Sequence, residues 1–197
     1  MVVVAALAAA ASLGACGSNS VTTDAAVGSG LQGLMLRPAR LAPALALRNY
    51  TGEPVNIQAF RGKAVLVTFV YTHCPDVCPL IVSSLAAAQR QLGQTAKRLQ
   101  ILAVTVDPKR DTPGAIRQFL GARDATGRMD YLLGSPRQLM RTWKAWDVGV
   151  SVDRNHLIAG HSAVVYGISA SGRMEVVYPS DFSPAQIVHD VPMLADS

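Results

Sequence analysis

Two cysteines lie four positions apart, at a point where a strand pattern gives way to a helix pattern. Residues 64–71 form a short run rich in β-branched and aromatic residues, which is typical of a buried strand. Residues 80–92 follow with the composition and spacing of a helix, and Cys74 and Cys78 occupy the turn between the two. The exposed N–H groups and partial positive charge at a helix N-terminus favour thiolate over thiol. The turn is therefore a candidate site for thiol or metal chemistry.

The rest of the chain predicts one α/β domain around that turn. A second buried strand is predicted at 99–106, parallel to the strand at 64–71 and central with it. The other predicted elements, in chain order, are a β-hairpin at 45–60, a helix beginning at Thr112-Pro113, a strand at 129–133, a helix at 135–143, strands at 163–169 and 174–178, and a helix beginning at Ser183-Pro184. This order predicts a thioredoxin-like fold, a central mixed sheet flanked by helices with an N-terminal β-hairpin.

The N-terminus predicts an address outside the cytoplasm. Residues 1–11 are almost wholly Val, Ala and Leu, a stretch too short to cross a bilayer, which needs about 20 residues. Leu13-Gly14-Ala15-Cys16 resembles a bacterial lipobox, in which Cys16 is lipidated and becomes the first mature residue. No Lys or Arg precedes the apolar stretch, so either the true start lies upstream or this is not a functioning signal; an uncleaved apolar anchor is the alternative. Both alternatives place the domain in the bacterial cell envelope, anchored to the membrane and facing the periplasm or the cell exterior.

The chain therefore divides into three predicted parts. Residues 1–16 are a lipoprotein-like signal segment, residues 17–40 are a flexible tether rich in Ser, Thr, Gly and Ala, and residues 41–197 are the folded domain. With Cys16 consumed by lipid, Cys74 and Cys78 are the only remaining pair. One pair is too few for a disulfide scaffold but is the right number for a redox or metal site.

The charge pattern argues against nucleic-acid binding. The formal net charge is +5, but no run of Lys or Arg concentrates it, and no basic stripe with interleaved aromatic residues is present. The charge is that of a solvated surface, suited at most to an acidic partner or an anionic lipid surface.

Three sequence segments are expected at one edge of the predicted sheet. The cysteine turn and the loop beginning at Asp107 both follow the carboxyl ends of parallel strands, where α/β folds place their sites. Residues 155–162, which include His161, enter a strand antiparallel to those two and so begin at the same edge. Cys74, Cys78, Asp107 and His161 are thus expected to lie close together.

These segments resemble the Sco/SenC family of copper-handling proteins, which act in assembly of the dinuclear copper centre of cytochrome c oxidase. The resemblance lies in YTHCPDVCP at 71–79, TVDPKRDTP at 105–113 and GHS at 160–162, and it covers about residues 45–193. It implies that Cys74, Cys78 and His161 bind one copper ion. It also implies partners: the copper-accepting subunit of cytochrome c oxidase, a thiol reductant and another copper chaperone.

The chemistry of the residues agrees with copper. Two soft thiolates and one imidazole suit copper, and a low coordination number suits Cu(I) in particular, with Cu(II) also open. Zinc would need a fourth ligand, for which His73 and His156 are the available candidates. Taken alone, His161 would be interpreted as a hydrogen-bonded core histidine; beside the cysteine motif it is predicted as a ligand. Asp107 either stabilises its loop or orients the ligands from outside the coordination sphere.

Two enzymatic alternatives use the same fold. A peroxiredoxin-like peroxidase requires Pro-x-x-x-Thr-x-x-Cys, whereas Thr72 lies two residues before Cys74, not three, and position 68 holds Thr instead of Pro. Thioredoxin-type exchange expects Cys-x-x-Cys and a cis-proline facing the pair, and no proline immediately precedes the strand at 163–169. Both patterns favour a metallochaperone over an enzyme.

Thiol chemistry nevertheless stays open as the alternative function. The two sulfurs that bind copper would also serve a thiol–disulfide oxidoreductase that reduces the cysteines of the oxidase copper site or of another extracytoplasmic partner. A purely structural disulfide between Cys74 and Cys78 is disfavoured, because closing so short a loop gains little chain entropy.

Overall fold

The computed structural model describes residues 30–152, 154 and 158–197. The predictions for the signal segment, for Cys16 and for His156 lie outside these residues, as does the first part of the predicted tether.

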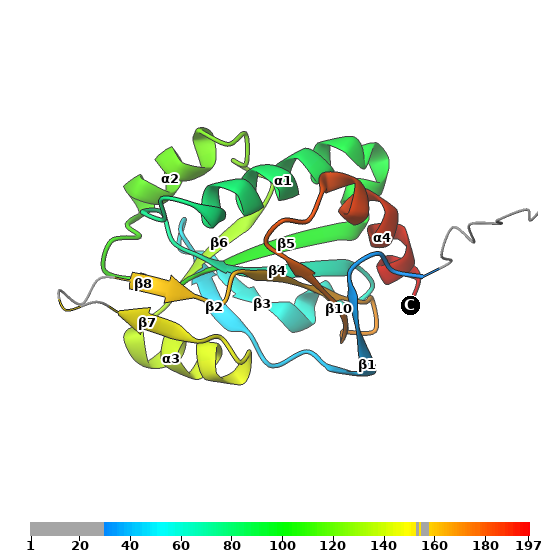
Figure 1. Cartoon of the computed structure of the whole chain (residues 1–197), viewed down its shortest axis with the longest axis horizontal. Coiled ribbons are helices and arrows are strands. Elements are labelled where there is room, and N and C mark those ends of the chain that lie inside the picture. The colour runs from blue at the N-terminus through cyan, green and yellow to red at the C-terminus, as the bar shows by residue number, and fades with distance from the viewer. Residues whose placement is uncertain (1–29, 153, 155–157) are drawn as a thin grey trace, which may run out of the picture.

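An eight-stranded mixed sheet runs through the middle of the molecule (Figure 1). Its strands lie in the order β1-β10-β9-β4-β5-β6-β2-β3; β4, β5 and β6 are parallel, and the other neighbouring pairs are antiparallel. A separate two-stranded ribbon consists of β7 and β8. The strand bounds are β1 Leu34–Leu41, β2 Ala46–Asn49, β3 Pro54–Asn56, β4 Ala64–Val70, β5 Leu99–Thr105, β6 Asp130–Leu133, β7 Val150–Val152, β8 Ile158–His161, β9 Val164–Ile168 and β10 Arg173–Pro179.

Helices cover both faces of the sheet. α1 and α4 pack against each other on one face, and α3 lies on the opposite side in Figure 1. Two helices begin at the predicted caps, since Thr112 Oγ1 accepts the N–H of Ala115 and Ser135 Oγ accepts the N–H of Gln138. The helix bounds are η1 Ile57–Phe60, α1 Val77–Gln91, η2 Gly93–Arg98, α2 Pro113–Gly121, α3 Pro136–Ala145 and α4 Pro184–Asp196. The predicted mixed sheet flanked by helices, with an N-terminal hairpin formed by β2 and β3, is confirmed.

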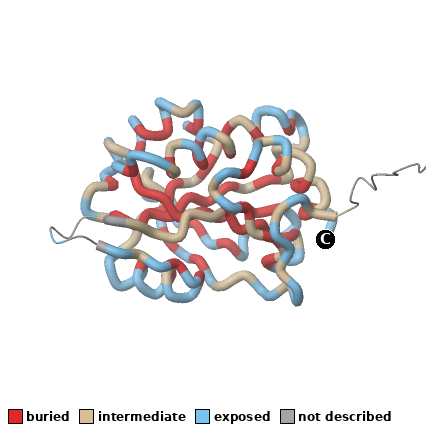
Figure 2. The backbone as a smooth tube through the Cα atoms, in the orientation of Figure 1, coloured by how far each residue is buried: buried red, intermediate tan, exposed pale blue. Residues whose placement is uncertain are grey.

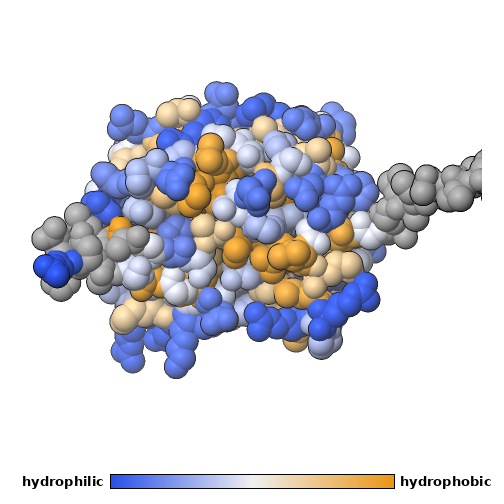
Figure 3. All heavy atoms as spheres, viewed as in Figure 1, coloured by the Kyte–Doolittle hydropathy of each residue, from blue (hydrophilic) through white to orange (hydrophobic). Residues whose placement is uncertain are grey.

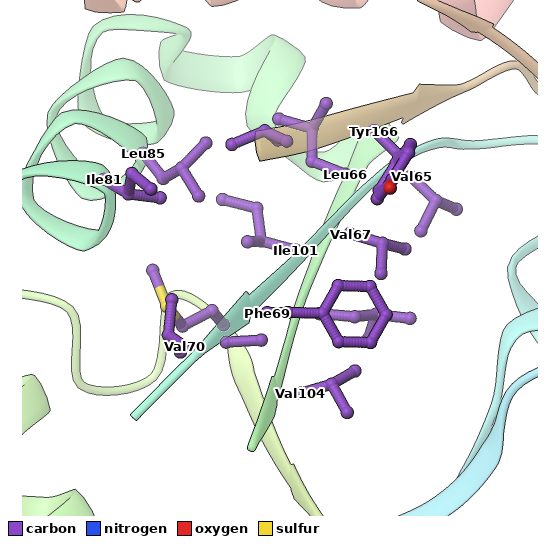
Figure 4. Packing of buried hydrophobic residues seen from close by; sticks show 14 of the residues in the cluster. Val65, Leu66, Val67, Phe69, Val70, Ile81, Leu85, Ile101, Val104 and Tyr166 are labelled. Carbon is purple, nitrogen blue, oxygen red and sulfur yellow. The ribbon is translucent and has the colours of Figure 1, made fainter. Parts of the chain in front are cut away.

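β4 is buried along its whole length and divides the core into two halves. Because strand side chains alternate between faces, one set of β4 residues points toward α1 and the other set points away. Figure 4 shows Leu66 and Val70 on the α1 side and Phe69 on the far side. The Phe69 ring meets Tyr166 edge-on, with ring centroids 6.3 Å apart. The buried segments gather at the centre of the molecule in Figure 2. A strand packed on both faces fixes the position of the turn that follows it.

The prediction that the tether extends to residue 40 is wrong at its C-terminal end. β1 lies within that range and pairs antiparallel with β10 at the edge of the sheet. Its start is held by the fully buried carboxylate of Asp190, which accepts the backbone N–H of Gln32 at 2.8 Å and that of Gly33 at 3.4 Å. The β1 side chains are largely exposed, so this strand carries none of the apolar alternation from which strands are predicted.

The surface of the described residues is mostly polar. The face shown in Figure 3 is largely hydrophilic, with apolar side chains in separate patches. In the described part of the chain, none of the helices combines the length and apolar character that a membrane crossing requires. The exposed large apolar side chains are Leu34, Met35, Leu41, Leu80 and Met140.

Candidate metal centre

The sheet topology brings the predicted site segments to one edge. β4 and β5 run parallel with Val70 opposite Thr105, so the cysteine turn and the Asp107 loop leave the sheet side by side. β9 runs antiparallel to β4, and Thr68 Oγ1 donates to the carbonyl of Val164 at 3.0 Å, so β9 begins at that same edge. His161 lies three residues before Val164 and therefore faces the cysteine turn, as the sequence predicted.

The cysteine turn is closed by backbone hydrogen bonds. The N–H of Cys74 donates to the carbonyl of Tyr71 at 3.3 Å, and the N–H of Cys78, in the first turn of α1, points at Cys74 Sγ at 3.5 Å. The second contact directs the positive end of the helix toward the sulfur, which compensates negative charge on a coordinating thiolate. Asp76 is the residue before α1, but it is exposed and its side chain makes no capping hydrogen bond.

Cys78 and His161 are in contact. The Nδ1 of His161 lies 3.1 Å from the carbonyl oxygen of Ser162, which can only accept, so Nδ1 carries the ring proton. The Nε2 lone pair is therefore free, and it lies 3.4 Å from Cys78 Sγ. This is the ring orientation that a histidine ligand takes, with one nitrogen anchored to the backbone and the other presented to the metal.

Burial keeps both of these groups uncharged in the absence of metal. Burial raises the pKa of the fully enclosed Cys78 thiol well above its ordinary value, and the neighbouring Cys74 adds to the rise. Burial also lowers the pKa of His161 below its ordinary value. The resting contact is thus a thiol S–H facing a neutral imidazole nitrogen, and a metal would displace the thiol proton.

The spacing of this pair fits a shared ion. For bonds of about 2.3 Å to sulfur and about 2.0 Å to nitrogen, an angle of about 110° at the metal separates the two ligand atoms by about 3.5 Å. The observed separation between Cys78 Sγ and His161 Nε2 is 3.4 Å. Among the described residues, however, no three His, Cys, Asp or Glu side chains are arranged to hold one ion at once. The two-atom contact is in place, and completing a set of three requires side-chain adjustment.

Asp107 is buried and paired with a residue of its own loop. Its carboxylate forms an ion pair with the guanidinium of Arg110, and its N–H donates to Thr105 Oγ1 at 3.0 Å. Arg110 in turn lies over the ring of Tyr71, 5.9 Å from its centroid, and Tyr71 meets the His161 ring edge-on at 5.7 Å. Asp107 therefore reaches His161 only through two other side chains.

The sequence analysis missed Asp111, which is the polar centre beneath the site. Its buried carboxylate accepts four hydrogen bonds, from the N–H and hydroxyl of Thr72 at 2.8 and 2.7 Å, from Thr105 Oγ1 at 2.6 Å and from the Tyr131 hydroxyl at 2.7 Å. These donors come from the turn that follows β4, from the last residue of β5 and from β6. The position just before the helix cap Thr112 was the available signal, but a charged residue beside Lys and Arg favours a solvated loop in sequence.

The other described histidines lie outside this contact. His73 is exposed, and its Nδ1 lies 2.9 Å from Thr72 Oγ1. His189 is on α4, where its Nδ1 lies 2.7 Å from Asp190 Oδ1. Neither supplies a further ligand in the described arrangement.

The fold and the site together define a class of protein. This is a thioredoxin-like α/β domain that carries a Cys-x-x-x-Cys turn and a facing histidine at the carboxyl edge of its parallel strands. Residues 35–196 match the SCO1/SenC family. The chain belongs to that family, as its motifs predicted.

Individual relatives agree with this assignment. The chain is 33% identical to the mitochondrial SCO2 homolog of Bos taurus over 138 residues, which is 67% of this chain and 51% of the bovine protein, so it spans about half the length of that relative. It is 31% identical to a putative copper-binding protein of Stutzerimonas stutzeri over 147 residues, covering 74% of this chain and 68% of that one.

Solved structures show the same fold. The apo Sco1 protein of Thermus thermophilus superposes with a TM-score of 0.72 at 28% identity, covering 82% of this chain and 95% of that one. The copper-bound ScoI of Bradyrhizobium japonicum superposes with a TM-score of 0.68 at 25% identity, covering 78% of this chain and 99% of that one. The thioredoxin-like fold predicted from the sequence is therefore confirmed.

Proposed function

We propose that this protein is a copper chaperone that binds one copper ion through Cys74, Cys78 and His161. The observation that carries the proposal is the contact between Cys78 Sγ and the free lone pair of His161 Nε2, beside Cys74, in a member of the SCO1/SenC family. Copper is the cargo in this function. The two thiolates suit Cu(I), and the neutral imidazole makes the set suitable for Cu(II) as well.

Delivery would proceed by exchange of ligands without a change in the oxidation state of copper. An incoming thiol of the acceptor loses its proton as it binds copper, and that proton neutralises the departing thiolate of Cys74 or Cys78. The acceptor that we propose is the copper-accepting subunit of a cytochrome oxidase, with its dinuclear copper centre as the destination. A thiol reductant would be needed whenever the pair has become oxidised, because a disulfide cannot bind copper.

We also propose an address in the cell envelope. Lipidation of Cys16 would hold the domain at a membrane surface, on a tether that ends before β1. The mass of the mature protein tests this part: a diacylglycerol-modified N-terminal cysteine supports the anchor, and an unmodified chain that retains residues 1–15 contradicts it.

Anaerobic titration with Cu(I) tests the copper function. The chain from residue 30 onward, which holds all the described elements, is reduced, freed of reductant and titrated beside Cys78→Ser, His161→Ala and the control His189→Ala. We expect one tightly bound Cu(I) per chain in the wild type and in the control, and loss of tight binding in Cys78→Ser. His161→Ala is expected to weaken Cu(II) more than Cu(I), because two thiolates alone hold Cu(I) nearly linearly.

The same experiment separates the alternative function. A wild type that binds no Cu(I) tightly, but whose Cys74–Cys78 disulfide turns over a model dithiol substrate, would identify a thiol–disulfide oxidoreductase. Equal losses of Cu(I) and Cu(II) affinity in His161→Ala would contradict the ligand set even if copper binds.

A further inference from the structure

Exposed cations gather at the edge of the sheet opposite the candidate metal centre. The turn at 61–63 precedes β4 and the cysteine turn follows it, so the length of that buried strand, about 20 Å, separates the two turns. β10 runs antiparallel to β9, as β4 does, so β10 begins at the edge where β4 begins, and β1 ends there because it runs antiparallel to β10. In Figure 1, β1 lies at the opposite end of the molecule from the ribbon of β7 and β8, which carries His161.

Backbone hydrogen bonds join the three segments that meet at this edge. The N–H of Gly62, in the turn before β4, donates to the carbonyl of Ala170 at 3.0 Å. The N–H of Ala42, just after β1, donates to the carbonyl of Gly172 at 3.0 Å. Leu41 is 63% exposed and lies opposite the first residue of β10. We call this surface the basic edge, and its exposed members are Arg40, Leu41, Arg61, Lys63 and Arg173.

Acidic side chains do not neutralise the basic edge. The segments 34–42, 61–63 and 170–173 contain no Asp or Glu. Within the described part of the chain, none of the four cations forms an ion pair, and the nearby Asp196 is paired with Arg98. Arg61 and Arg173 donate to neutral oxygens, one of a side-chain amide and one of a backbone carbonyl. The positive charge of this edge is therefore available to a partner.

The edge that holds the metal centre has charges of both signs. Asp76 precedes α1, Asp181 follows β10, and both are exposed there together with Lys109. Charge is thus separated along the direction of the strands, so a negatively charged surface attracts the basic edge more strongly than the edge at the cysteine turn.

An anionic phospholipid surface fits the basic edge. Each Lys or Arg close to such a surface strengthens binding about fivefold, and apolar side chains among them add to it by insertion. Three of the five exposed large apolar side chains of the described residues lie on β1, Leu41 among them. With Cys16 lipidated as proposed above, residues 17–29 reach at most about 45 Å when fully extended. A link of that reach keeps the domain near the membrane but allows either edge to face it, so the charge separation decides which edge does.

We propose that the basic edge docks on a membrane of anionic phospholipid, with its cations at the headgroup phosphates and Leu41 inserted between the headgroups. The inference rests on the cell-envelope address proposed above. Docking at this edge turns the metal centre away from the membrane, about one strand length from the lipid, where the cysteine turn stays open to a copper acceptor.

Vesicle binding tests the proposal. The chain from residue 30 onward, which holds all the described elements and lacks Cys16, is sedimented with vesicles of phosphatidylglycerol or of phosphatidylcholine. We expect binding to phosphatidylglycerol only, weakening as salt is added. Replacing Arg61 and Lys63 together by Gln is expected to lower the partition coefficient about 25-fold, at about fivefold per cation.

Matched variants on α3, which lies away from β1 in Figure 1, are the controls. Arg137→Gln with Arg141→Gln removes the same charge from exposed positions and is expected to bind as the wild type does. Leu41→Ser is expected to weaken binding, whereas Met140→Ser, at a side chain that is 58% exposed, is expected to leave it unchanged. Equal losses in the α3 variants, or equal binding to both lipids, would overturn the proposal.

The orientation of the docked wild type is measured without any variant. Spin-labelled lipid in the vesicles is expected to broaden the amide signals of residues 40–42, 61–63 and 171–173 and to leave those of residues 73–80 sharp. Broadening centred on the cysteine turn would overturn the proposal, and so would binding of soluble polyglutamate as tightly as vesicles, which would identify an acidic protein as the partner. Docking through this edge in a protein whose Cys16 carries no lipid would uphold the proposal and contradict only the anchor.

Discussion

Replacement of Asp111 by Asn is the sharpest test of how the site is supported. The substitution keeps the shape of the side chain but turns one acceptor oxygen into an NH₂ donor. One face of the carboxylate must keep its oxygen, because the Thr72 N–H that donates there at 2.8 Å cannot reverse its polarity. The amide nitrogen is therefore expected to face the hydroxyls of Thr105 and Tyr131, which now donate to Asp111 Oδ2 at 2.6 and 2.7 Å.

The loss can be estimated from those two bonds. Each hydrogen bond to a charged group contributes about 1.5–3 kcal/mol, so losing both removes about 3–6 kcal/mol. Part of this is recovered, since a hydroxyl can accept from the new NH₂ group. The recovery is incomplete because Thr105 Oγ1 already accepts the N–H of Asp107. Among the described residues, the other acceptor near the Tyr131 hydroxyl is the Val70 carbonyl, at a long 3.4 Å. We expect Asp111→Asn to lower the free energy of unfolding by about 2–4 kcal/mol.

Urea unfolding of the reduced apo chain measures this loss. Asp196→Asn is the control, because it removes a carboxylate whose ion pair with Arg98 is exposed on both sides; such pairs contribute about 1 kcal/mol or less. The midpoint should fall at an unchanged slope in both variants, and by much more in Asp111→Asn. Equal losses in the two variants, or a loss below about 1 kcal/mol at Asp111, would refute the account of Asp111 as the support of the site.

Three further predictions follow from buried groups. Because burial raises the pKa of Cys78, copper must displace its proton, so the conditional Cu(I) affinity is expected to rise by at least about tenfold per pH unit around neutrality, with any proton displaced from Cys74 adding to this; an affinity independent of pH in a competition titration would contradict it. The raised pKa of Cys78 also makes the stability of the apo fold depend on pH: its contribution is fully present below pH 9.0, the ordinary pKa of a cysteine thiol, and is lost as the pH rises above that value. Urea midpoints at about pH 7 and about pH 10 would show the fall, which is expected to be smaller in Cys78→Ala. Asp190→Asn is expected to loosen β1 and speed tryptic cleavage within it, unlike the exposed control Asp196→Asn; equal cleavage of the two variants would refute the role of Asp190.

The elements around the cysteine motif were predictable because local and global signals agree there. The run at 64–70 is apolar on both faces, which only a central strand needs, and β4 lies at the centre of the sheet. The caps Thr112 and Ser135 begin α2 and α3 through hydrogen bonds that the sequence specifies within three residues. Because β4 and β5 run parallel and β9 runs antiparallel to β4, the topology brings Cys78 and His161 to the same edge of the sheet.

What the sequence could not predict depends on contacts between distant residues. β1 is mostly exposed and exists because Asp190, more than 150 residues away, binds the backbone that leads into it. Asp111 resembles a solvated loop residue in the sequence, but the fold directs at it the hydroxyls of Thr72 from the turn after β4, Thr105 from β5 and Tyr131 from β6. The ribbon of β7 and β8 was missed as well, because its two short strands pair only with each other.

That ribbon also shows that the proposed ligands are supported in different ways. The cysteines are supported by β4 and α1, which are packed into the core, whereas His161 ends β8 in a ribbon outside the main sheet. The chain reaches the edge of the sheet at Val164, three residues after His161, where the Val164 carbonyl accepts the hydroxyl of Thr68. The sulfur positions are therefore fixed by folding, and the third position depends on how the ribbon meets the sheet. It follows that removing Cys78 removes a proposed ligand fixed by the core, while removing His161 removes a proposed ligand carried by the ribbon.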